Sequence, residues 1–204
     1  MDSKAYLDQI SASVRPTKPS RQHGILSSPI FKVSIGGLIA LIFIIILGSV
    51  LGGTTTSAKD EAIELNLYIN NTMQAISDYQ PSLKSSNLRS ASASLYSVLS
   101  NTTRDLSAYL DSAYGSDAKA TATMESDAAL HLDGLTSDLF EAKINGILDR
   151  IYAHKMSYEI SIITSKESSL YTRLSDDTAK SSLGSSYNSL QNLYDEFNNF
   201  SETK

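Results

Sequence analysis

Residues 183–197 read LGSSYNSLQNLYDEF, and their apolar and aromatic side chains recur at intervals of four, three, four and three residues. The recurring positions are Leu183, Tyr187, Leu190, Tyr194 and Phe197. Intervals of three and four residues place side chains on one face of an α-helix. This stretch therefore predicts a final helix whose apolar face packs against other helices, with Asp176 and Asp177 as caps at its start.

Two similar helical stretches are predicted nearer the N-terminus. The first begins at the S-x-x-D signal of Ser57 and Asp60, and its apolar face consists of Ile63, Leu67, Met73 and Ile76. The second has leucines spaced in sevens and fours, at Leu88, Leu95, Leu99, Leu106 and Leu110. Tyr114 to Asp117 is typical of a helix C-cap followed by the N-cap of the next helix.

A third long helical region is predicted between the second stretch and the final helix. Its apolar residues are Leu132, Leu135, Leu139, Ile147, Leu148 and Ile151, followed by Met156, Ile160, Ile163, Leu170 and Leu174. The second group is spaced 4, 3, 7 and 4 residues apart, as expected of a helix that packs along a partner. Asp133-Gly134 and Gly146 are the places where this region would kink or break.

These patterns predict an all-α chain, because no segment alternates apolar and polar residues as a strand does. We expect residues 58–204 to form an up-down bundle of about four helices. Pro81 leaves two alternatives. If Pro81 lies in a turn, it separates two bundle helices, and the polar residues around it favour this alternative. If Pro81 only kinks the helix, the two stretches form one rod of roughly 85 Å at 1.5 Å per residue.

Residues 33–53 read VSIGGLIALIFIIILGSVLGG and carry no charge. As a helix they would span roughly 31 Å, which matches the hydrocarbon core of a bilayer. A buried helix of a soluble domain is the alternative, but such helices usually keep a polar stripe. The sequence therefore predicts one transmembrane helix at residues 33–53, with the lipid bilayer as its partner.

Charge sets the predicted orientation. Residues 1–32 carry a net charge of +3, and residues 54–204 carry −8. The positive-inside rule places a basic tail of residues 1–32 in the cytoplasm, and puts the linker 54–57 and the bundle outside the cell membrane. A signal peptide cleaved near Ala58 is the alternative, but the basic region and the apolar run are both longer than such peptides have.

Small residues four apart recur in the predicted span, at Gly36 and Ala40 and again at Gly48 and Gly52. Such pairs let membrane helices approach closely, so they are candidate packing positions for a homo-oligomer. Single spans without a partner also contain glycine, and this alternative stays open.

The N-terminal stretch Tyr6-Leu7-Asp8-Gln9-Ile10 is followed by a basic linker with prolines and by one apolar run. In this order the first fifty or so residues resemble uncharacterised single-pass membrane proteins of small-genome candidate-phylum bacteria. Ser11 to Ser13 separate the stretch from Pro16, which is a departure from the resemblance. The resemblance implies a membrane anchor and no particular activity.

Composition excludes several function classes. The 204 residues include no Cys, which rules out disulfides, thiolate metal sites and thiol catalysis. The net charge of −5 argues against nucleic acid as a partner, because binding to phosphates requires a basic face. Serine is the most frequent residue, with 35 copies.

The motifs of common enzymes and cofactor sites do not occur in the sequence. Ser116 and Lys119 match S-x-x-K, but the partner motif K-T-G is missing, so we interpret the match as a helix start. Asp127 and His131 are four residues apart and would offer two metal ligands, although a surface ion pair or a solvated imidazole is the expected role. We therefore predict no catalytic residue, no metal and no cofactor.

The leading hypothesis is a non-enzymatic, single-pass membrane protein that displays an extracytoplasmic helical bundle to a protein or envelope partner. The alternative is a sensory bundle that binds a small ligand and signals through a partner in the membrane, because a tail of 32 residues has no room for an output domain. An envelope hydrolase is the third hypothesis, and it requires a catalytic cluster that sequence spacing does not reveal.

Overall fold

The computed structural model describes residues 57–201, and every regular element in that range is helical. The five α-helices are α3 (Ala58–Tyr79), α4 (Ser86–Tyr114), α5 (Ala122–Ile144), α6 (Leu148–Arg173) and α7 (Asp177–Asn198). Two 3₁₀ turns, η2 (Gln80–Ser82) and η3 (Gly115–Asp117), follow α3 and α4. The all-α prediction is confirmed for the described part of the chain.

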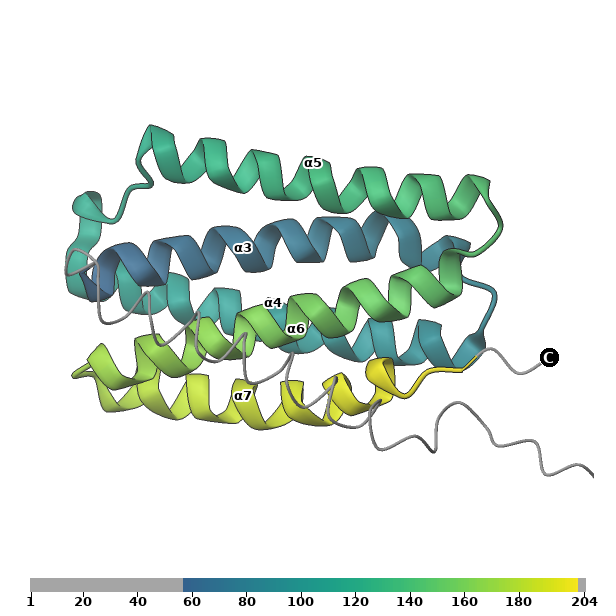
Figure 1. Cartoon of the computed structure of the whole chain (residues 1–204). Coiled ribbons are helices and arrows are strands. Elements are labelled where there is room, and N and C mark those ends of the chain that lie inside the picture. The colour runs from purple at the N-terminus through teal and green to yellow at the C-terminus, as the bar shows by residue number, and fades with distance from the viewer. Residues whose placement is uncertain (1–56, 202–204) are drawn as a thin grey trace, which may run out of the picture. The chain divides into compact units, whose positions relative to one another are not determined.

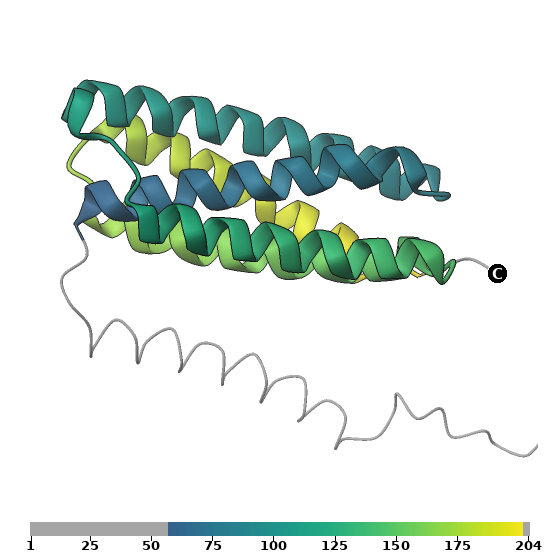
Figure 2. The same ribbon diagram turned by 90° about the horizontal axis from the view of Figure 1, so that it is seen from above.

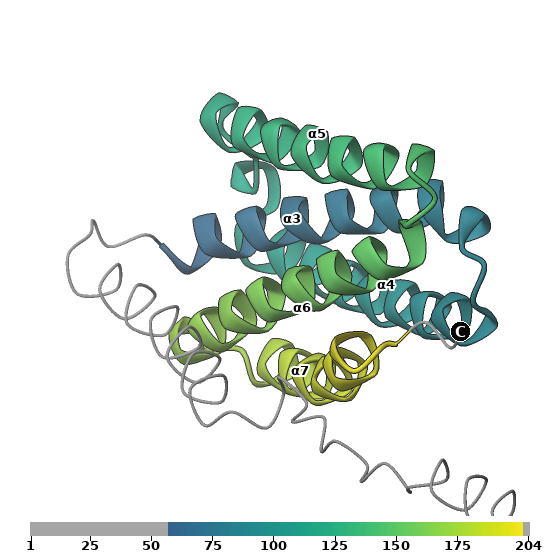
Figure 3. The same ribbon diagram turned by 45° about the vertical axis from the view of Figure 1, so that its right-hand side comes forward.

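Four of the helices form a ring around the core. α3 packs against α4, α4 against α7, α7 against α6, and α6 against α3. Each neighbour in the ring runs antiparallel to the next, and the connections lie at alternate ends of the bundle (Figure 2). α5 lies outside the ring and packs against α3 and α6 (Figure 3). The predicted up-down topology is therefore present, with one helix added to one side of it.

The bundle has five helices where about four were expected, because residues 122–173 divide at Gly146. Gly146 has φ 71°, a left-handed conformation that glycine adopts without strain. The Ile147 amide donates to the Ala142 carbonyl at 3.0 Å, and the Gly146 amide donates to the Lys143 carbonyl at 3.2 Å. This is the Schellman pattern that ends a helix. Gly134, the other predicted break, lies inside α5.

Pro81 lies in a turn, so the alternative of one kinked rod is wrong. η2 contains Pro81 and reverses the chain between α3 and α4. The side chain of Asp149 at the start of α6 fixes the segment that follows. Its Oδ1 accepts from the Lys84 amide at 2.9 Å, and its Oδ2 accepts from the Ser85 amide at 2.7 Å. A carboxylate thus satisfies the free amide groups where α4 begins.

Most of the predicted helix caps are confirmed. The Ser57 hydroxyl accepts from the Asp60 amide, and the Asp176 carboxylate accepts from the Ala179 amide at 2.7 Å. Gly115 ends α4 with φ 51°. The N-cap expected near Ser116 and Asp117 is wrong, since the Thr121 side chain caps α5 instead. Ser116 and Lys119 are exposed in the connection between α4 and α5, so the S-x-x-K match is not a helix start.

The core is formed by leucine and isoleucine stripes that face the inside of the ring. Tyr152 and Phe197 are the largest fully buried side chains, and their ring centroids are 6.3 Å apart. The predicted stripe of α7 is only partly correct. Leu183, Leu190 and Phe197 are buried, but Tyr187 is 38% exposed and Tyr194 is half-buried. The remaining buried positions of α7 are Ala179, Ser186 and Leu193.

The predicted tail (1–32), the predicted membrane span (33–53) and its small residues Gly36, Ala40, Gly48 and Gly52 lie outside the described residues. Between residues 57 and 201, none of the helices combines the length and the apolar character needed to cross a bilayer.

Replacing Gly134 with Ala is expected to raise the free energy of unfolding by about 0.5–1 kcal/mol. Gly134 lies in the interior of α5, and a Cβ added there meets no atom within 4 Å. The matched control is Gly146→Ala, which should destabilise the chain because its φ is +71°. Urea unfolding of both variants tests the assignment, and equal effects of the two substitutions would contradict it.

Candidate functional site

The outer face of α5 carries large apolar side chains that no other helix between residues 57 and 201 covers. Leu130 is 68% exposed, Phe140 is 55% exposed and Ile144 is 67% exposed. With Asp133 and Ser137, which are also exposed, they are spaced 3, 4, 3 and 4 residues apart on one helix face. We call these five residues the α5 stripe. The opposite face of α5 buries Leu135, Leu139 and Ala142 against the ring.

The surroundings of the α5 stripe are acidic. α5 contains five carboxylates, at Glu125, Asp127, Asp133, Asp138 and Glu141, and one lysine, Lys143. Asp138 forms an ion pair with Lys155 of α6. The α5 stripe is thus an apolar surface flanked mainly by negative charge. A partner with an apolar surface flanked by basic residues would be complementary to it.

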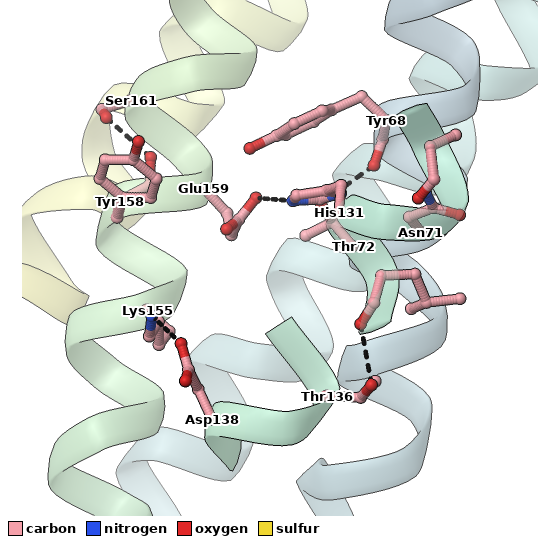
Figure 4. Close-up of polar contacts among 12 residues, drawn as sticks. Tyr68, Asn71, Thr72, His131, Thr136, Asp138, Lys155, Tyr158, Glu159 and Ser161 are labelled. Carbon is pink, nitrogen blue, oxygen red and sulfur yellow. Dashed lines mark hydrogen bonds and ion pairs between the residues drawn. The ribbon is translucent and has the colours of Figure 1, made fainter. Parts of the chain in front are cut away.

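A cluster of three side chains joins α5 to the ring (Figure 4). The Tyr68 ring of α3 stacks on the His131 ring of α5, with 4.1 Å between centroids and an interplanar angle of 19°. His131 Nε2 lies 2.9 Å from Oε2 of Glu159 on α6, and the Glu159 side chain is only 4% exposed. The three residues come from three helices, so the cluster fixes α5 against α3 and α6.

Further polar contacts support the same docking. The Asn71 side chain donates to the Ala128 carbonyl at 2.6 Å, and the Tyr79 hydroxyl donates to the Thr136 carbonyl at 2.9 Å. Burial of Tyr68, together with the negative charge of Glu159, raises the pKa of the Tyr68 hydroxyl above its ordinary value. Tyr68 therefore stays a neutral hydroxyl at physiological pH.

The geometry around His131 corrects the expectation for this residue. Glu159 is its carboxylate partner, whereas Asp127, one turn away on α5, is exposed. His131 Nδ1 is buried and has no hydrogen-bond partner among the described residues. Among residues 57–201, no group of three or more metal-ligating side chains is assembled. The pair between His131 and Glu159 holds α5 and α6 together.

A second buried polar network crosses the inside of the ring. The Thr102 hydroxyl of α4 lies 2.7 Å from the Ser186 hydroxyl of α7, which donates to Oε1 of Glu167 on α6 at 2.6 Å. Glu167 is 1% exposed, and its Oε2 has no hydrogen-bond partner in the part of the chain that the structure describes. Burial raises the pKa of Glu167 to about 8, against a smaller lowering by the Ser186 hydrogen bond. At neutral pH the carboxyl is therefore mostly protonated. The sequence analysis assigned no role to any of these three residues.

A hollow of about 1330 Å³ lies at the end of the bundle where α4 and α6 begin and α7 ends. Its lining is mostly polar and includes Lys84, Asn87, Lys143 and Glu196. The amide groups at the start of α4 face Asp149, which already occupies the place of an anion. The hollow is therefore a polar depression in the surface. The backbone amides of Lys84 and Ser85 are not free to bind a ligand there, because both donate to Asp149.

His131→Ala is expected to lower the free energy of unfolding by about 3 kcal/mol, because it removes the His131 partner of the Glu159 carboxylate, whose side chain is only 4% exposed. The matched control is His154→Ala, an exposed histidine on α6, for which about 0.5 kcal/mol or less is expected. Urea unfolding measures both. If the double variant H131A/E159L is no more stable than H131A, the penalty does not come from the orphaned carboxylate.

A scan against protein-family models, a search of curated proteins and a search of solved structures each gave no match.

Proposed function

We propose that this chain is a single-pass membrane-anchored protein that displays its helical bundle outside the cell membrane, where the α5 stripe binds a protein or envelope partner. The uncharged run at residues 33–53 and the charge difference across it support the anchor and its orientation. The observation that carries the binding role is the exposure of Leu130, Phe140 and Ile144 on one face of α5.

Single exposed apolar residues are common on soluble proteins, but three large ones on one helix face form a recognition surface. Their spacing suits a partner helix, which would meet them at the intervals of a coiled coil. Phe140 lies near the last turn of the stripe and is the aromatic anchor of the kind that dominates binding energy at interfaces. The acidic flanks favour a partner with basic residues around an apolar face.

A specific observation also supports a small-ligand-binding role. A groove of about 280 Å³ between α6 and α7 is lined by Tyr171, Tyr187 and part of Glu167. This groove is lined by α6 and α7, whereas the stripe belongs to α5, so the two roles are separate in the structure.

The triple variant L130S/F140S/I144S tests the proposed interface. Because all three side chains are exposed, the bundle should keep its stability to within about 1 kcal/mol, as measured by urea unfolding. Crosslinking in intact cells that make the protein naturally should then lose its crosslinked product. The control Y96S/Y158S removes exposed aromatic side chains from α4 and α6 and should keep the product. An unchanged product in the triple variant would refute the interface.

A further inference from the structure

Asp133 is the one charged residue of the α5 stripe, and it lies among the apolar side chains of the stripe. Leu130 comes three residues before it, and Phe140 comes seven residues after it. At about 3.6 residues per turn, Asp133 lies within about 20° of the middle of this helix face. α5 lies at the outside of the bundle, so the face that carries Asp133 points away from the ring of four helices (Figure 3).

The carboxylate of Asp133 has no cationic partner between residues 57 and 201. It takes part in none of the ion pairs of this range. The one lysine of α5, Lys143, comes ten residues later, which is about 15 Å along the helix axis. Lys155 of α6 pairs with Asp138 instead. A cation from a partner would therefore meet no competing cation at Asp133.

A helix that packs on both Leu130 and Phe140 also covers Asp133, because Asp133 lies between them. The axes of packed helices are about 8–10 Å apart, which leaves no bulk water over a residue at the middle of the contact. Burying a carboxylate without a counter-charge is strongly unfavourable, whereas a hydrogen-bonded lysine or arginine offsets much of this cost. The position opposite Asp133 therefore requires a cation.

A second copy of this chain does not supply that cation. In a parallel pair of α5 helices, Asp133 would face the same residue of the second copy. In an antiparallel pair centred on Ser137, Asp133 would face Glu141, because both are four residues from Ser137. Each arrangement brings two carboxylates together, and like charges across an interface suppress the pairing. Asp133 therefore disfavours self-pairing through the α5 stripe.

We propose that the α5 stripe binds an amphipathic helix of a different protein, and that this helix carries a lysine or arginine within its apolar face to meet Asp133. This proposal rests on the function proposed above and names the chemistry of the partner of the same surface. The stripe from Leu130 to Ile144 is about 21 Å long, so the partner helix contributes about four turns. One buried polar pair in an apolar seam fixes the register of two helices, and Asp133 thus determines specificity.

The test compares Asp133→Leu with Asp133→Glu in intact cells that make the protein naturally, using an amine-reactive crosslinker that does not react with carboxylates. Asp133→Leu adds apolar surface to the stripe, so it would strengthen binding to a partner that is purely apolar. A partner with a cation at this position would instead keep a buried charge without a counter-charge. We therefore expect the crosslinked product of Asp133→Leu to fall to about a tenth or less of its amount in the unaltered chain.

Asp133→Glu keeps the negative charge and should retain at least about a third of the product. The matched control Asp111→Leu makes the same change at an exposed position of α4 and should leave the product unchanged. Because Asp133 is exposed, the midpoint of urea unfolding should not fall in Asp133→Leu.

The proposal is overturned if Asp133→Leu keeps or increases the product, if Asp133→Glu loses as much of it as Asp133→Leu does, or if mass spectrometry finds only this chain in the product. The triple variant L130S/F140S/I144S separates this failure from a failure of the proposed function. If the triple variant loses the product while Asp133→Leu keeps it, the interface stands and the cationic partner is refuted. If the triple variant keeps the product, or if the unaltered chain gives none, the interface itself is refuted.

Discussion

The free energy of unfolding is expected to fall by on the order of 4 kcal/mol as the pH rises from about 4.5 to about 8, through Glu167 alone. In the unfolded chain this carboxyl ionises near its ordinary pKa of 4.5, whereas burial holds it protonated in the fold up to about 8. Between these values the folded chain binds the extra proton, so stability decreases with rising pH and becomes level above the window.

Glu167→Gln isolates this effect. The amide keeps an oxygen that accepts from Ser186 and has no charge to bury, so the variant should match the unaltered chain near pH 4.5 and exceed its stability near pH 8. Urea unfolding across the window gives the difference curve. The control is Glu125→Gln on α5, an exposed glutamate whose difference curve should be flat. A flat curve for Glu167→Gln would mean that its carboxyl is not buried as described.

Phe197→Ala is expected to destabilise the bundle by about 3–5 kcal/mol, because it empties a fully buried aromatic position. Phe197 packs beside Tyr152 and connects the end of α7 to α6. Tyr187→Ala should cost less than about 1 kcal/mol, since its ring is 38% exposed.

These two variants distinguish the structure from the prediction made from sequence. The sequence pattern placed Phe197 and Tyr187 on the same inward face, whereas in the structure only Phe197 is buried. Equilibrium unfolding in urea measures both changes. Similar losses of stability in the two variants would mean that Tyr187 packs in the core. This would contradict the structure, in which α7 turns Phe197 inward and leaves Tyr187 exposed.

Helical periodicity was sufficient to predict which regions are helical, because this depends on residues close together in the sequence. It did not give the number of helices, since α5 and α6 were predicted as one region. The N-caps Ser57 and Asp176 were predicted, whereas Ser85 and Thr121, which cap α4 and α5, were not.

Periodicity was less able to identify the inward positions. The predicted stripe of α6 has a gap of seven residues between Ile163 and Leu170, and Glu167 fills it. In α4 the two gaps of seven contain Ser92 and Thr102, which are both buried.

These polar residues pair across the ring. Ser92 lies within 2.5 Å of the Tyr152 hydroxyl, and Thr102 reaches Glu167 through Ser186. A gap of seven in an otherwise regular stripe therefore marks an inward polar position in this bundle. Which of them pair with each other depends on helix packing, and a single sequence does not contain that information.

The outward position of α5 was also beyond prediction. The predicted stripe contained Leu135 and Leu139, which are buried, and left out Phe140 and Ile144, which are exposed. It did not indicate that α5 lies outside the ring of four helices. The cluster of Tyr68, His131 and Glu159 joins three helices that are distant in sequence, and only the tertiary structure brings it together. Asp127 was the near neighbour along the helix, and proximity in sequence therefore suggested the wrong partner.

The proposal of a displayed interface is tested most directly by labelling single cysteines in intact cells, which the chain permits because it has no Cys of its own. Ser137→Cys lies in the α5 stripe, and Ser189→Cys is the exposed control on α7. A maleimide that does not cross membranes should label Ser189→Cys in intact cells that make the protein naturally, and should label Ser137→Cys more slowly. In the purified protein the two rates should become similar, because the partner is gone. If neither variant is labelled before lysis, the bundle is not displayed outside the cell membrane. If both variants are labelled at equal rates in cells, no partner covers the α5 stripe. Either result would contradict the proposal.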